Sequence, residues 1–551
     1  MQNLEQQEVR PVAIEWIALA VGITLTLRYR WLLDDAFVYF RYIDNFLFLK
    51  IGLVYNQGEF VEGFSSPLWM LTLLVGRALH LDFWYLIQGL GVGLFVVFCF
   101  FLVRLNRSLS PSAADGGTSI IDFPLLYLAP NYAVTTYFTS GLETPLVQIV
   151  AVAYALFILK PTSRILTVLV ALSPLIRHEL ALPWILVFLW SWVRQRRFPL
   201  RLTLITAAIG GCWMLFRIYY YADLFPNTFY LKNVVDVGQG WVYLHDTLGT
   251  YRFYGVAAIF VIGLIALLAR GHRDVDLAAR GMMVLVAATV AGYVVKIGGD
   301  PRHFRYLAFP FVLTVCASAG LAERLVSLRL LQRRWVAAAF GLILMAIFFW
   351  AYPPQLDRHP VTHREKESMV DNIRDASHHR HGERRRHELW SSRANIRLMQ
   401  KYRRQNQPFR YLGVESRIRC LTSYQSFRYR VINTFGLTDP FLARSDVQAD
   451  WSAHKWALRP QARDLVRIYR RDKIGPGIFR RAVEAGTAPQ WVVANLETIE
   501  AIERKAFNRH KPVENLRLAF TFPGKIEPVG VPPADPPGSQ SSSTHLGCGS
   551  R

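Results

Sequence analysis

The chain has 551 residues, of which 52% are hydrophobic and 13% aromatic, and its formal net charge is +23. This apolar content over this length excludes an ordinary soluble protein, because many runs of roughly 17–22 residues are nearly free of charge and could cross about 30 Å of hydrocarbon. The positive charge does not indicate nucleic acid as a partner. Lys and Arg cluster between apolar runs and in the C-terminal third, which membrane topology and contact with anionic lipids explain better.

The predicted fold class is therefore a polytopic α-helical membrane protein with about eleven transmembrane helices. The first apolar run contains Glu15 and lacks a small-residue cleavage site, so we expect a retained span and not a signal peptide. Segment 66–79 is too short to cross, and its Ser66–Pro67 start predicts a juxtamembrane or re-entrant helix. The expected spans are 12–28, 83–103, 122–138, 144–159, 165–177, 179–193, 202–220, 253–270, 280–296, 304–322 and 334–351.

Basic residues between these spans predict the topology. They fall on alternate loops, which the positive-inside rule assigns to the cytoplasm. An odd number of crossings then places the N-terminus inside and everything after about residue 352 outside, with the active site on the outer, periplasmic face of an inner membrane. The basic loops carry Arg104 and Arg107, Lys160 and Arg164, Arg194, Arg196 and Arg197, Arg270 and Arg273, and Arg329, Arg333 and Arg334.

Three domains follow from this topology. Residues 1–352 form the transmembrane domain, including the first outer loop at 29–65. Residues 353–525 mix aromatic and basic residues with short alternating stretches, which predicts a periplasmic domain of α/β or α+β class. Residues 526–551 are rich in Pro, Gly and Ser, and we expect them to be disordered.

The first outer loop contains "WLLDDAFVYFRY", in which two adjacent acids follow the first span. Because two like charges raise each other's pKa and repel, Asp34 and Asp35 are costly unless a cation or a reaction uses them. We interpret one of them as a general base for an acceptor hydroxyl, with its neighbour and Arg41 setting its pKa. The alternative is that both acids only cap or solvate a helix end. Glu62, later in the loop, either binds substrate or pairs locally.

Two further motifs lie at the outer ends of spans. "TSGLETP" places Glu143 in a very short loop, where a lone acid either serves a site or is solvated. "SPLIRHELALP" places Arg177, His178 and Glu179 at a break between two short helices. Ionisable groups at membrane depth are functional by default, so we expect a cavity-lining role, with an internally satisfied structural cluster as the alternative.

"DLFPNTFYLKN" places Asn227 and Lys232 just outside a span. Lys is a point charge that suits a phosphate, although the motif could equally be a Pro-Asn turn with a snorkelling Lys. "KIGGDPRHFRYLAFP" follows another span, and its two Gly residues would let the backbone approach a ligand. We expect its charged residues to bind a charged ligand at the outer mouth; they are Lys296, Asp300, Arg302, His303 and Arg305.

No metal site or firm cofactor is predicted. The five Cys residues show no CxxC or Cys/His spacing, which argues against a zinc site or a disulfide framework. The basic stretch 378–388, "HHRHGERRRHE", would repel a metal and is interpreted as a solvated or headgroup-contacting surface. A divalent cation is possible but not indicated, and no nucleotide-binding loop is present.

Taken in order, these motifs resemble the AftB-type terminal arabinofuranosyltransferases, which are GT-C glycosyltransferases of the mycobacterial and corynebacterial envelope. The resemblance covers roughly residues 10–470, and differs from the commoner "RPEG" in having "RHEL". It implies a decaprenyl-phosphoryl-arabinofuranose donor and an arabinan acceptor, with Asp34 and Asp35 as the catalytic pair. The residues that carry it are "DDAFVYFRY", "GLVYNQGEFVEGFSSPLW", "SGLETPL", "RHE", "PNTFYLK", "GGDPRHFRYL" and "GLTDPFLAR".

The charged residues fit this class of enzyme. A polyprenyl-phosphate donor needs an apolar groove, a cation for the departing phosphate and a carboxylate for the acceptor. We expect the phosphate to bind among Lys232, Arg302, Arg305 and Arg41, with membrane lipids and an envelope glycan as the other partners. Two alternatives remain open: another GT-C transferase acting on protein or lipid A, and a transporter or flippase of a lipid-linked anionic substrate. Charge concentrated at the outer ends of spans favours the enzyme.

Overall fold

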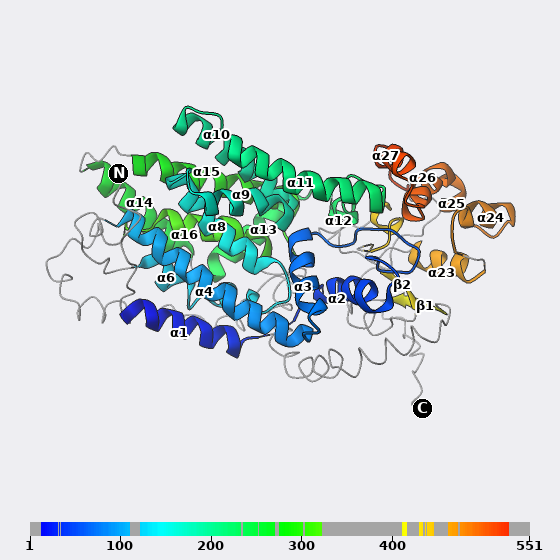
Figure 1. Ribbon diagram of the computed structural model, residues 1–551, viewed down its shortest axis with the longest axis horizontal. Helices are drawn as coiled ribbons and strands as arrows, with labels where there is room; N and C mark the ends of the chain where they lie inside the picture. The colour runs from blue at the N-terminus through cyan, green and yellow to red at the C-terminus, as the bar shows by residue number, and fades with distance from the viewer. Residues whose placement is uncertain are drawn as a thin grey trace.

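A computed structural model describes residues 13–30, 32, 33, 35–110, 122–232, 235–251, 253–269, 275–300, 304–321, 410–415, 429–433, 436, 438–445, 461–471 and 474–527. Within these ranges the chain is mostly helical, with a bundle at one end and shorter C-terminal helices at the other (Figure 1). The bundle consists of α1 (Ala13–Arg28), α2 (Ala36–Asp44), α3 (Pro67–Ala78), α4 (Phe83–Leu109), α6 (Phe123–Leu128), α7 (Tyr132–Tyr137), α8 (Thr144–Leu159), α9 (Arg164–Ile176), α10 (Ala181–Gln195), α11 (Leu200–Tyr221), α12 (Asn227–Lys232), α13 (Val237–Thr250), α14 (Phe253–Ala269), α15 (Val275–Lys296) and α16 (Ala308–Ala317).

Three helices in the described part of the chain are long and apolar enough to cross a membrane: α4, α11 and residues 277–296 of α15. A fourth crossing results if α13 and α14, which meet at a bend of 81°, form one broken span. The predicted eleven spans are therefore not confirmed. Helices α3, α8, α9 and the segment 305–317 are apolar but shorter than the roughly 20 residues that cross a bilayer unaided. The predicted span 334–351 lies outside the described residues.

The expected continuous span at 122–138 is wrong, because it is divided into α6 and α7. Pro130 has no backbone N–H to continue a helix. Asn131 then starts a new helix, with its side-chain oxygen accepting a hydrogen bond from the Ala133 N–H at 3.0 Å. Asp122 caps α6 in the same way through the Leu125 N–H, at 3.0 Å. These two caps favour two short helices over one long one.

The predicted helix start at Ser66–Pro67 is confirmed. The Ser66 hydroxyl accepts a hydrogen bond from the Trp69 N–H at 3.3 Å, and Pro67 occupies the first turn of α3, where no N–H is needed. The segment 221–252, between two of the expected spans, contains α12 and α13. Of these, α13 packs along α15.

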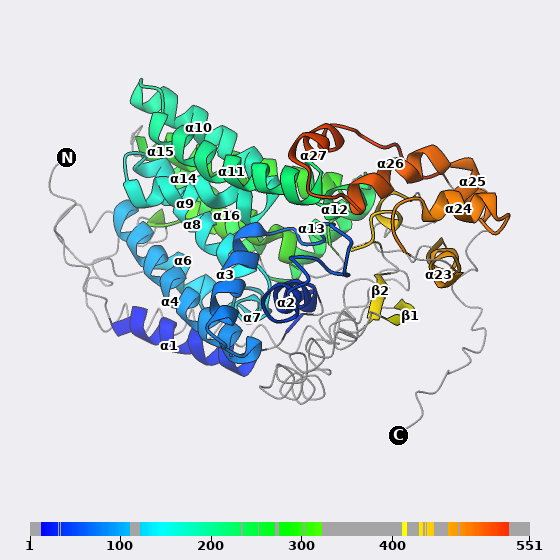
Figure 2. The same ribbon diagram turned by 45° about the vertical axis from the view of Figure 1, so that its right-hand side comes forward.

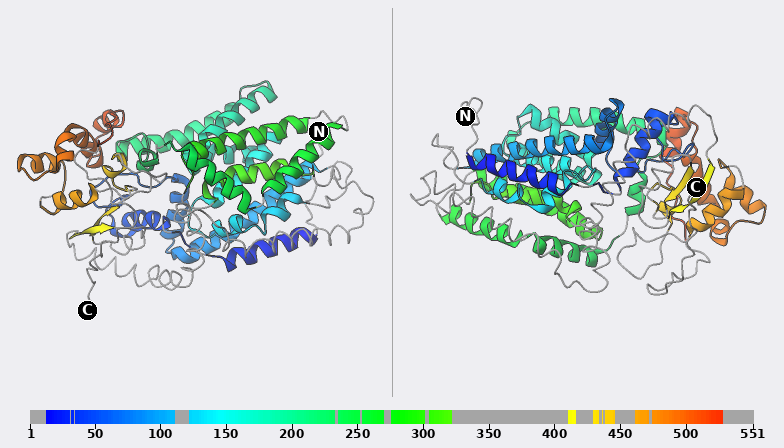
Figure 3. Two further views of the ribbon diagram at one scale, coloured as in Figure 1. Left: turned by 180° about the vertical axis from the view of Figure 1, so that it is seen from behind. Right: turned by 90° about the horizontal axis from the view of Figure 1, so that it is seen from below.

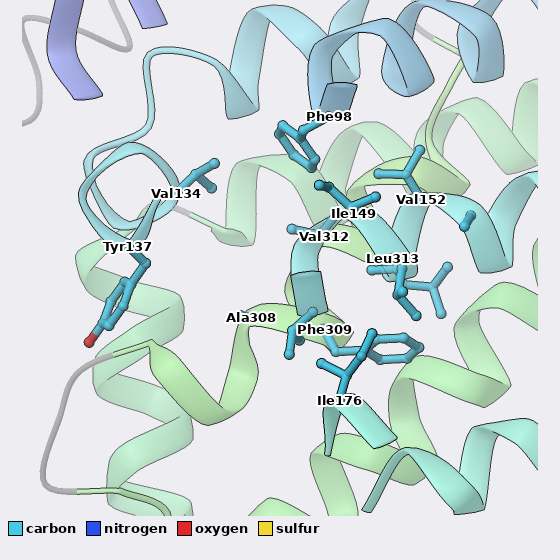
Figure 4. Close-up of a cluster of buried hydrophobic side chains, with 14 of the residues drawn as sticks. Phe98, Val134, Tyr137, Ile149, Val152, Ile176, Ala308, Phe309, Val312 and Leu313 are labelled. Atoms are coloured by element: carbon cyan, nitrogen blue, oxygen red, sulfur yellow. The ribbon is translucent and has the colours of Figure 1, made fainter. Parts of the chain in front are cut away.

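The bundle core forms where α4, α8, α9 and α16 meet. Buried side chains from these helices gather there, with Val134 and Tyr137 of α7 to one side, as Figure 4 shows. Helix α8 lies at the centre, because nearly all of its side chains are buried. Its uniformly apolar sequence is typical of a helix surrounded on all sides. The labelled members of this cluster are Phe98, Val134, Tyr137, Ile149, Val152, Ile176, Ala308, Phe309, Val312 and Leu313.

The described C-terminal segments form a second group with its own hydrophobic cluster, at the end of the bundle where α2 lies (Figures 2 and 3). Strands β1 (Arg410–Glu415) and β2 (Tyr429–Asn433) pair in parallel, with a register shift between Tyr411 and Val414. Ile526, one residue beyond the predicted end of this domain, is buried in the cluster and its N–H bonds to the Arg444 carbonyl at 2.9 Å. The helices are α23 (Gln461–Arg471), α24 (Ile478–Glu484), α25 (Gln490–Ala494), α26 (Leu496–Ala506) and α27 (Pro512–Ala519).

Candidate active site

Among the described residues, six charged side chains from four separate parts of the sequence gather where helices of the bundle end near α2. They comprise four carboxylates and two guanidinium groups, so the group carries a formal excess of two negative charges. We call this set the acid–arginine cluster. Its members are Asp35, Glu143, Arg177, Glu179, Asp300 and Arg305.

Arg305 is the hub of the cluster. Its Nη1 donates to Asp35 Oδ2 at 2.9 Å, and its Nη2 donates to Glu143 Oε1 at 3.4 Å. Asp300 Oδ2 lies 3.8 Å from the same Nη1. The guanidinium is buried, and pairing with three carboxylates offsets the cost of removing its charge from water.

Arg177 is the second cation. It lies in extended conformation between the end of α9 and a 3₁₀ turn, η2 (His178–Leu180), so the predicted break at "RHEL" is present. Its Nε donates to Glu179 Oε1 at 2.5 Å, and its Nη1 lies 3.8 Å from Glu143 Oε1. Glu143 thus lies between the two guanidinium groups.

Glu143 is fully buried, so the alternative of a solvated loop acid does not hold. A close approach of two loops places it near Asp35. The Leu33 N–H donates to the Ser140 carbonyl at 2.8 Å, and Trp69 Nε1 donates to the Gly141 carbonyl at 2.9 Å. Gly141 has φ +79°, and a Cβ there would lie 2.8 Å from the Cβ of Ala36, so only glycine fits.

Two tyrosines that the sequence analysis did not select complete the cluster. The Tyr39 hydroxyl donates to Glu143 Oε2 at 3.5 Å, and burial together with this carboxylate raises the pKa of Tyr39, so its proton stays in place. The Tyr306 ring lies under Arg177, with the guanidinium carbon 4.2 Å from the ring centre. Both had a sequence signal: Tyr39 is four positions after Asp35, one helical turn, and Tyr306 directly follows Arg305.

Asp35 differs from the other carboxylates of the cluster in its exposure. Its side chain is 20% exposed, whereas those of Glu143 and Asp300 are fully buried and that of Glu179 is 8% exposed. Of these four acids, Asp35 therefore offers the best access to a molecule arriving from outside.

The loop before Arg305 is tightly constrained. Gly298 and Gly299 have positive φ, but their close approach is to α13: a Cβ on Gly299 would lie 2.4 Å from the Tyr243 ring. This contact replaces the expected approach of the backbone to a ligand. Phe304, a buried non-glycine residue, has φ +63°, a strained conformation held by packing against aromatic neighbours. It fixes the direction from which Arg305 enters the cluster.

Glu62 and Asn227 belong to a different group. Glu62 forms a two-point ion pair with Arg217, with distances of 2.5 and 3.1 Å. Its carbonyl accepts a hydrogen bond from the Asn227 N–H at 2.8 Å. The Asn227 side chain donates to the carbonyls of Gly436 and Asp439, at 2.9 and 3.1 Å. These hydrogen bonds hold the "PNTFYLK" motif against the "GLTDPFLAR" motif.

Asp223 continues this second group, which we call the docking junction. Its carboxylate pairs with Arg444 at 2.9 Å and Lys505 at 3.3 Å, and accepts from the Tyr230 hydroxyl at 2.6 Å. Arg444 also stacks on the Tyr230 ring at 3.8 Å. A small cleft lies here, lined among others by Glu62, Asp223, Arg444 and Lys505.

The remaining expected site residues lie away from the acid–arginine cluster or outside the residues that the structure describes. Arg41 is buried and donates to the Tyr55 carbonyl at 2.8 Å, so its guanidinium is not brought to the acid–arginine cluster. His178 is at its edge, with Nδ1 3.6 Å from Glu179 and its ring against Phe229 of α12. Outside the description fall Asp34, Arg302, His303 and the side chain of Lys232.

In the described ranges, no three His, Cys, Asp or Glu side chains are placed to hold a metal ion together. The stretch 378–388 lies outside those ranges, as do Cys420 and Cys548. Cys99 and Cys316 are buried and unbonded, and Cys212 is exposed.

No family model and no solved structure match the chain. Two curated relatives are similar, each named a terminal beta-(1->2)-arabinofuranosyltransferase. The protein from Corynebacterium glutamicum is 24% identical over 373 residues, covering 58% of this chain and 52% of the relative. The protein from Mycobacterium tuberculosis is 26% identical over 369 residues, covering 58% of each. The chain spans about half the length of the curated relatives it matches, and these identities show a distant relationship.

Proposed function

We propose that this protein is a membrane glycosyltransferase of GT-C type. It moves an arabinofuranosyl residue from a polyprenyl-phosphate donor to a glycan acceptor of the cell envelope, on the periplasmic face of the inner membrane. The observation that carries the proposal is the partly exposed Asp35 carboxylate, held by buried Arg305 where helices of an apolar bundle end. The names of the two distant relatives support the same chemistry.

In this proposal Asp35 is the general base. It takes the proton from the acceptor hydroxyl as the oxygen of that hydroxyl forms a bond to the anomeric carbon. The bond from that carbon to the phosphate oxygen breaks, and its electron pair leaves with the polyprenyl phosphate. Arg305 orients the Asp35 carboxylate through their ion pair, in which the Arg305 Nη1 lies 2.9 Å from Asp35 Oδ2. Asp34 remains the neighbouring candidate for positioning the hydroxyl.

The departing phosphate requires a cation beyond those already paired in the cluster. The cluster has more carboxylates than guanidinium groups, so Lys232 and Arg302 carry this role in the proposal, together with Arg305. The position of α12 supports a role for the "PNTFYLK" motif, because the Phe229 ring lies 6.1 Å from the His178 ring at the edge of the cluster.

The test is transfer of labelled sugar by membranes that contain the protein. Radiolabelled decaprenyl-phosphoryl-arabinose and an oligoarabinoside should yield a labelled, longer oligosaccharide, and membranes with Asp35→Asn should not. Label on protein or lipid A would instead support another GT-C transferase. Movement of the labelled lipid across vesicles without any product would support a transporter and contradict the proposal.

A further inference from the structure

Helix α27 presents an apolar face that no described residue covers. Val513, Leu516 and Phe520 are 83%, 50% and 59% exposed. Their i, i+3, i+7 spacing places them on one side of the helix. Phe522, just beyond the helix, is 60% exposed, and the Lys505 Nζ lies 5.9 Å from the centre of its ring. Four large apolar side chains within ten residues are more than the scattered exposure of an ordinary surface and mark an interaction site.

The opposite face of α27 docks on the end of α11. The buried Asn515 side chain donates to the Tyr219 carbonyl at 2.6 Å. Just before α27, Asn508 donates to the Tyr220 carbonyl at 3.2 Å, and the His510 ring stacks on the Tyr220 ring with centres 4.8 Å apart. Helix α27 lies beside the Tyr221 end of α11 in two views (Figures 1 and 2).

Helix α11 itself has the properties of a lipid-facing span. It has 22 residues, a mean hydropathy of 1.5 and only 11% of its apolar window buried. Its exposed side chains include Leu204, Leu215 and Tyr219. Aromatic residues are enriched where a span meets the headgroups, and the three consecutive tyrosines 219–221 end this helix. The contacts with Tyr219 and Tyr220 therefore hold α27 at the depth of the membrane surface.

The charge around α27 suits lipid headgroups. Residues 509–525 contain four basic side chains and one acidic one, Glu514. Arg517 is exposed beside the apolar face. A short helix with apolar residues on one face and Lys or Arg around it is typical of a segment that lies in the interface. The other basic residues are Arg509, Lys511 and Lys525.

We propose that residues 509–525 form an interfacial membrane segment. Val513, Leu516, Phe520 and Phe522 enter the boundary between headgroups and acyl chains, and the basic residues contact anionic headgroups. The occupant of this face is lipid and not a second copy of the chain, because the segment is fixed to the end of a helix that exposes its own apolar surface to the bilayer. This contact anchors the C-terminal helices beside the docking junction.

The first test measures depth in the full-length protein reconstituted into phosphatidylcholine vesicles containing phosphatidylglycerol. A nitroxide is attached to V513C, with the native cysteines replaced. V493C is the matched control, because Val493 is also an exposed valine on a C-terminal helix, α25, but lies away from α11. We expect the ratio of oxygen to nickel-chelate collisions to be several-fold higher at 513 than at 493. Equal ratios would overturn the proposal, as would spin–spin broadening between two copies at 513.

A second test uses the unmodified protein, so it does not depend on cysteine replacement. Hydrogen exchange of residues 509–522 is compared in vesicles with and without phosphatidylglycerol, with α26 as the internal reference. We expect severalfold slower exchange with the anionic lipid in 509–522 and no change in α26. Identical exchange of 509–522 in both vesicles and in detergent would contradict lipid contact.

Discussion

The acid–arginine cluster and the docking junction are both buried groups of acids and arginines, yet they differ in balance and in access. The cluster has four carboxylates for two guanidinium groups, and one carboxylate, on Asp35, is partly exposed. The junction has two acids for three cations, and it is supplemented by hydrogen bonds from Asn227 to backbone carbonyls.

In the proposed function, this difference separates a reacting group of side chains from a structural one. Excess negative charge in a buried site is expensive and persists where a reaction or a cationic ligand uses it. Nearly balanced charge with backbone hydrogen bonds instead fixes how two parts of a chain fit together. The junction joins the segments next to α3 and α11 to the C-terminal segments, whereas the cluster joins the ends of bundle helices.

The largest expected effect comes from removing the hub of the cluster. Arg305→Ala leaves three carboxylates facing one another with only Arg177 nearby, which should lower the free energy of unfolding by about 3–5 kcal/mol. Arg444→Ala should cost less, about 1–3 kcal/mol, because Lys505 and Tyr230 still satisfy Asp223. Chemical unfolding in detergent micelles measures both. Arg305→Lys is the control that retains the positive charge. Equal losses of the free energy of unfolding in the two alanine variants would mean that the cluster and the junction do not differ in how much they depend on their arginine.

The next effect is on turnover. Asp35→Asn is nearly isosteric and leaves Arg305 paired with Glu143 and Asp300, so the fold should persist. Turnover with donor and acceptor should fall at least about a hundredfold, the lower end of a general-base contribution, equivalent to about 2.7 kcal/mol. Asp34→Asn is the comparison within the pair. Near wild-type turnover in both variants would move the base to another acid of the cluster.

A double-mutant cycle tests whether the junction acts as a structural clamp. Asp223→Asn and Arg444→Met should show a coupling free energy of about 0.5–3 kcal/mol, since the pair is buried and close. The exposed pair between Arg480 and Glu500 is the reference, and its coupling should be smaller because solvent screens it. A coupling no larger than that of the reference pair would mean that Asp223 and Arg444 contribute little to docking.

The smallest effect concerns pH. Burial among Phe60, Tyr219 and Tyr220 lowers the pKa of His510 in the docked state. The pKa of an undocked His is about 6.5. As the pH falls, an undocked His510 therefore binds a proton before the docked one does. Docking of α27 should therefore be fully stable above about pH 6.5 and weaken as the pH falls below it. Hydrogen exchange of 508–519, corrected for intrinsic rates, measures this. His510→Phe should retain the stacking and abolish the pH dependence.

Local sequence signals located several parts of the fold correctly. The Ser66–Pro67 start of α3 and the break at "RHEL" depend on capping groups and on polar residues within an apolar run, which act over a few residues. Hydropathy also identified α4, α11 and most of α15. It failed at 122–138, because apolar content does not reveal where Pro130 and Asn131 divide a helix.

For the site, the sequence by itself selected the acids and arginines but not their partners. It grouped Asp35 with Arg41, which lies six positions later, whereas the structure pairs Asp35 with Arg305, 270 positions later. It also placed Glu62 and Asn227 with the other substrate-binding candidates, whereas they form the docking junction.

The physical reason is the distance along the sequence over which each kind of interaction acts. Caps, turns and hydrophobic periodicity follow from neighbouring residues, and they decide which segments become helices and which residues lie at their ends. Which of those ends meet is decided by packing, such as the contact at Gly141 that brings the first outer loop against the start of α8. Only the tertiary structure could therefore show that the two similar sets of charges lie in different places, one with the partly exposed Asp35 and one around Asp223 against the C-terminal segments.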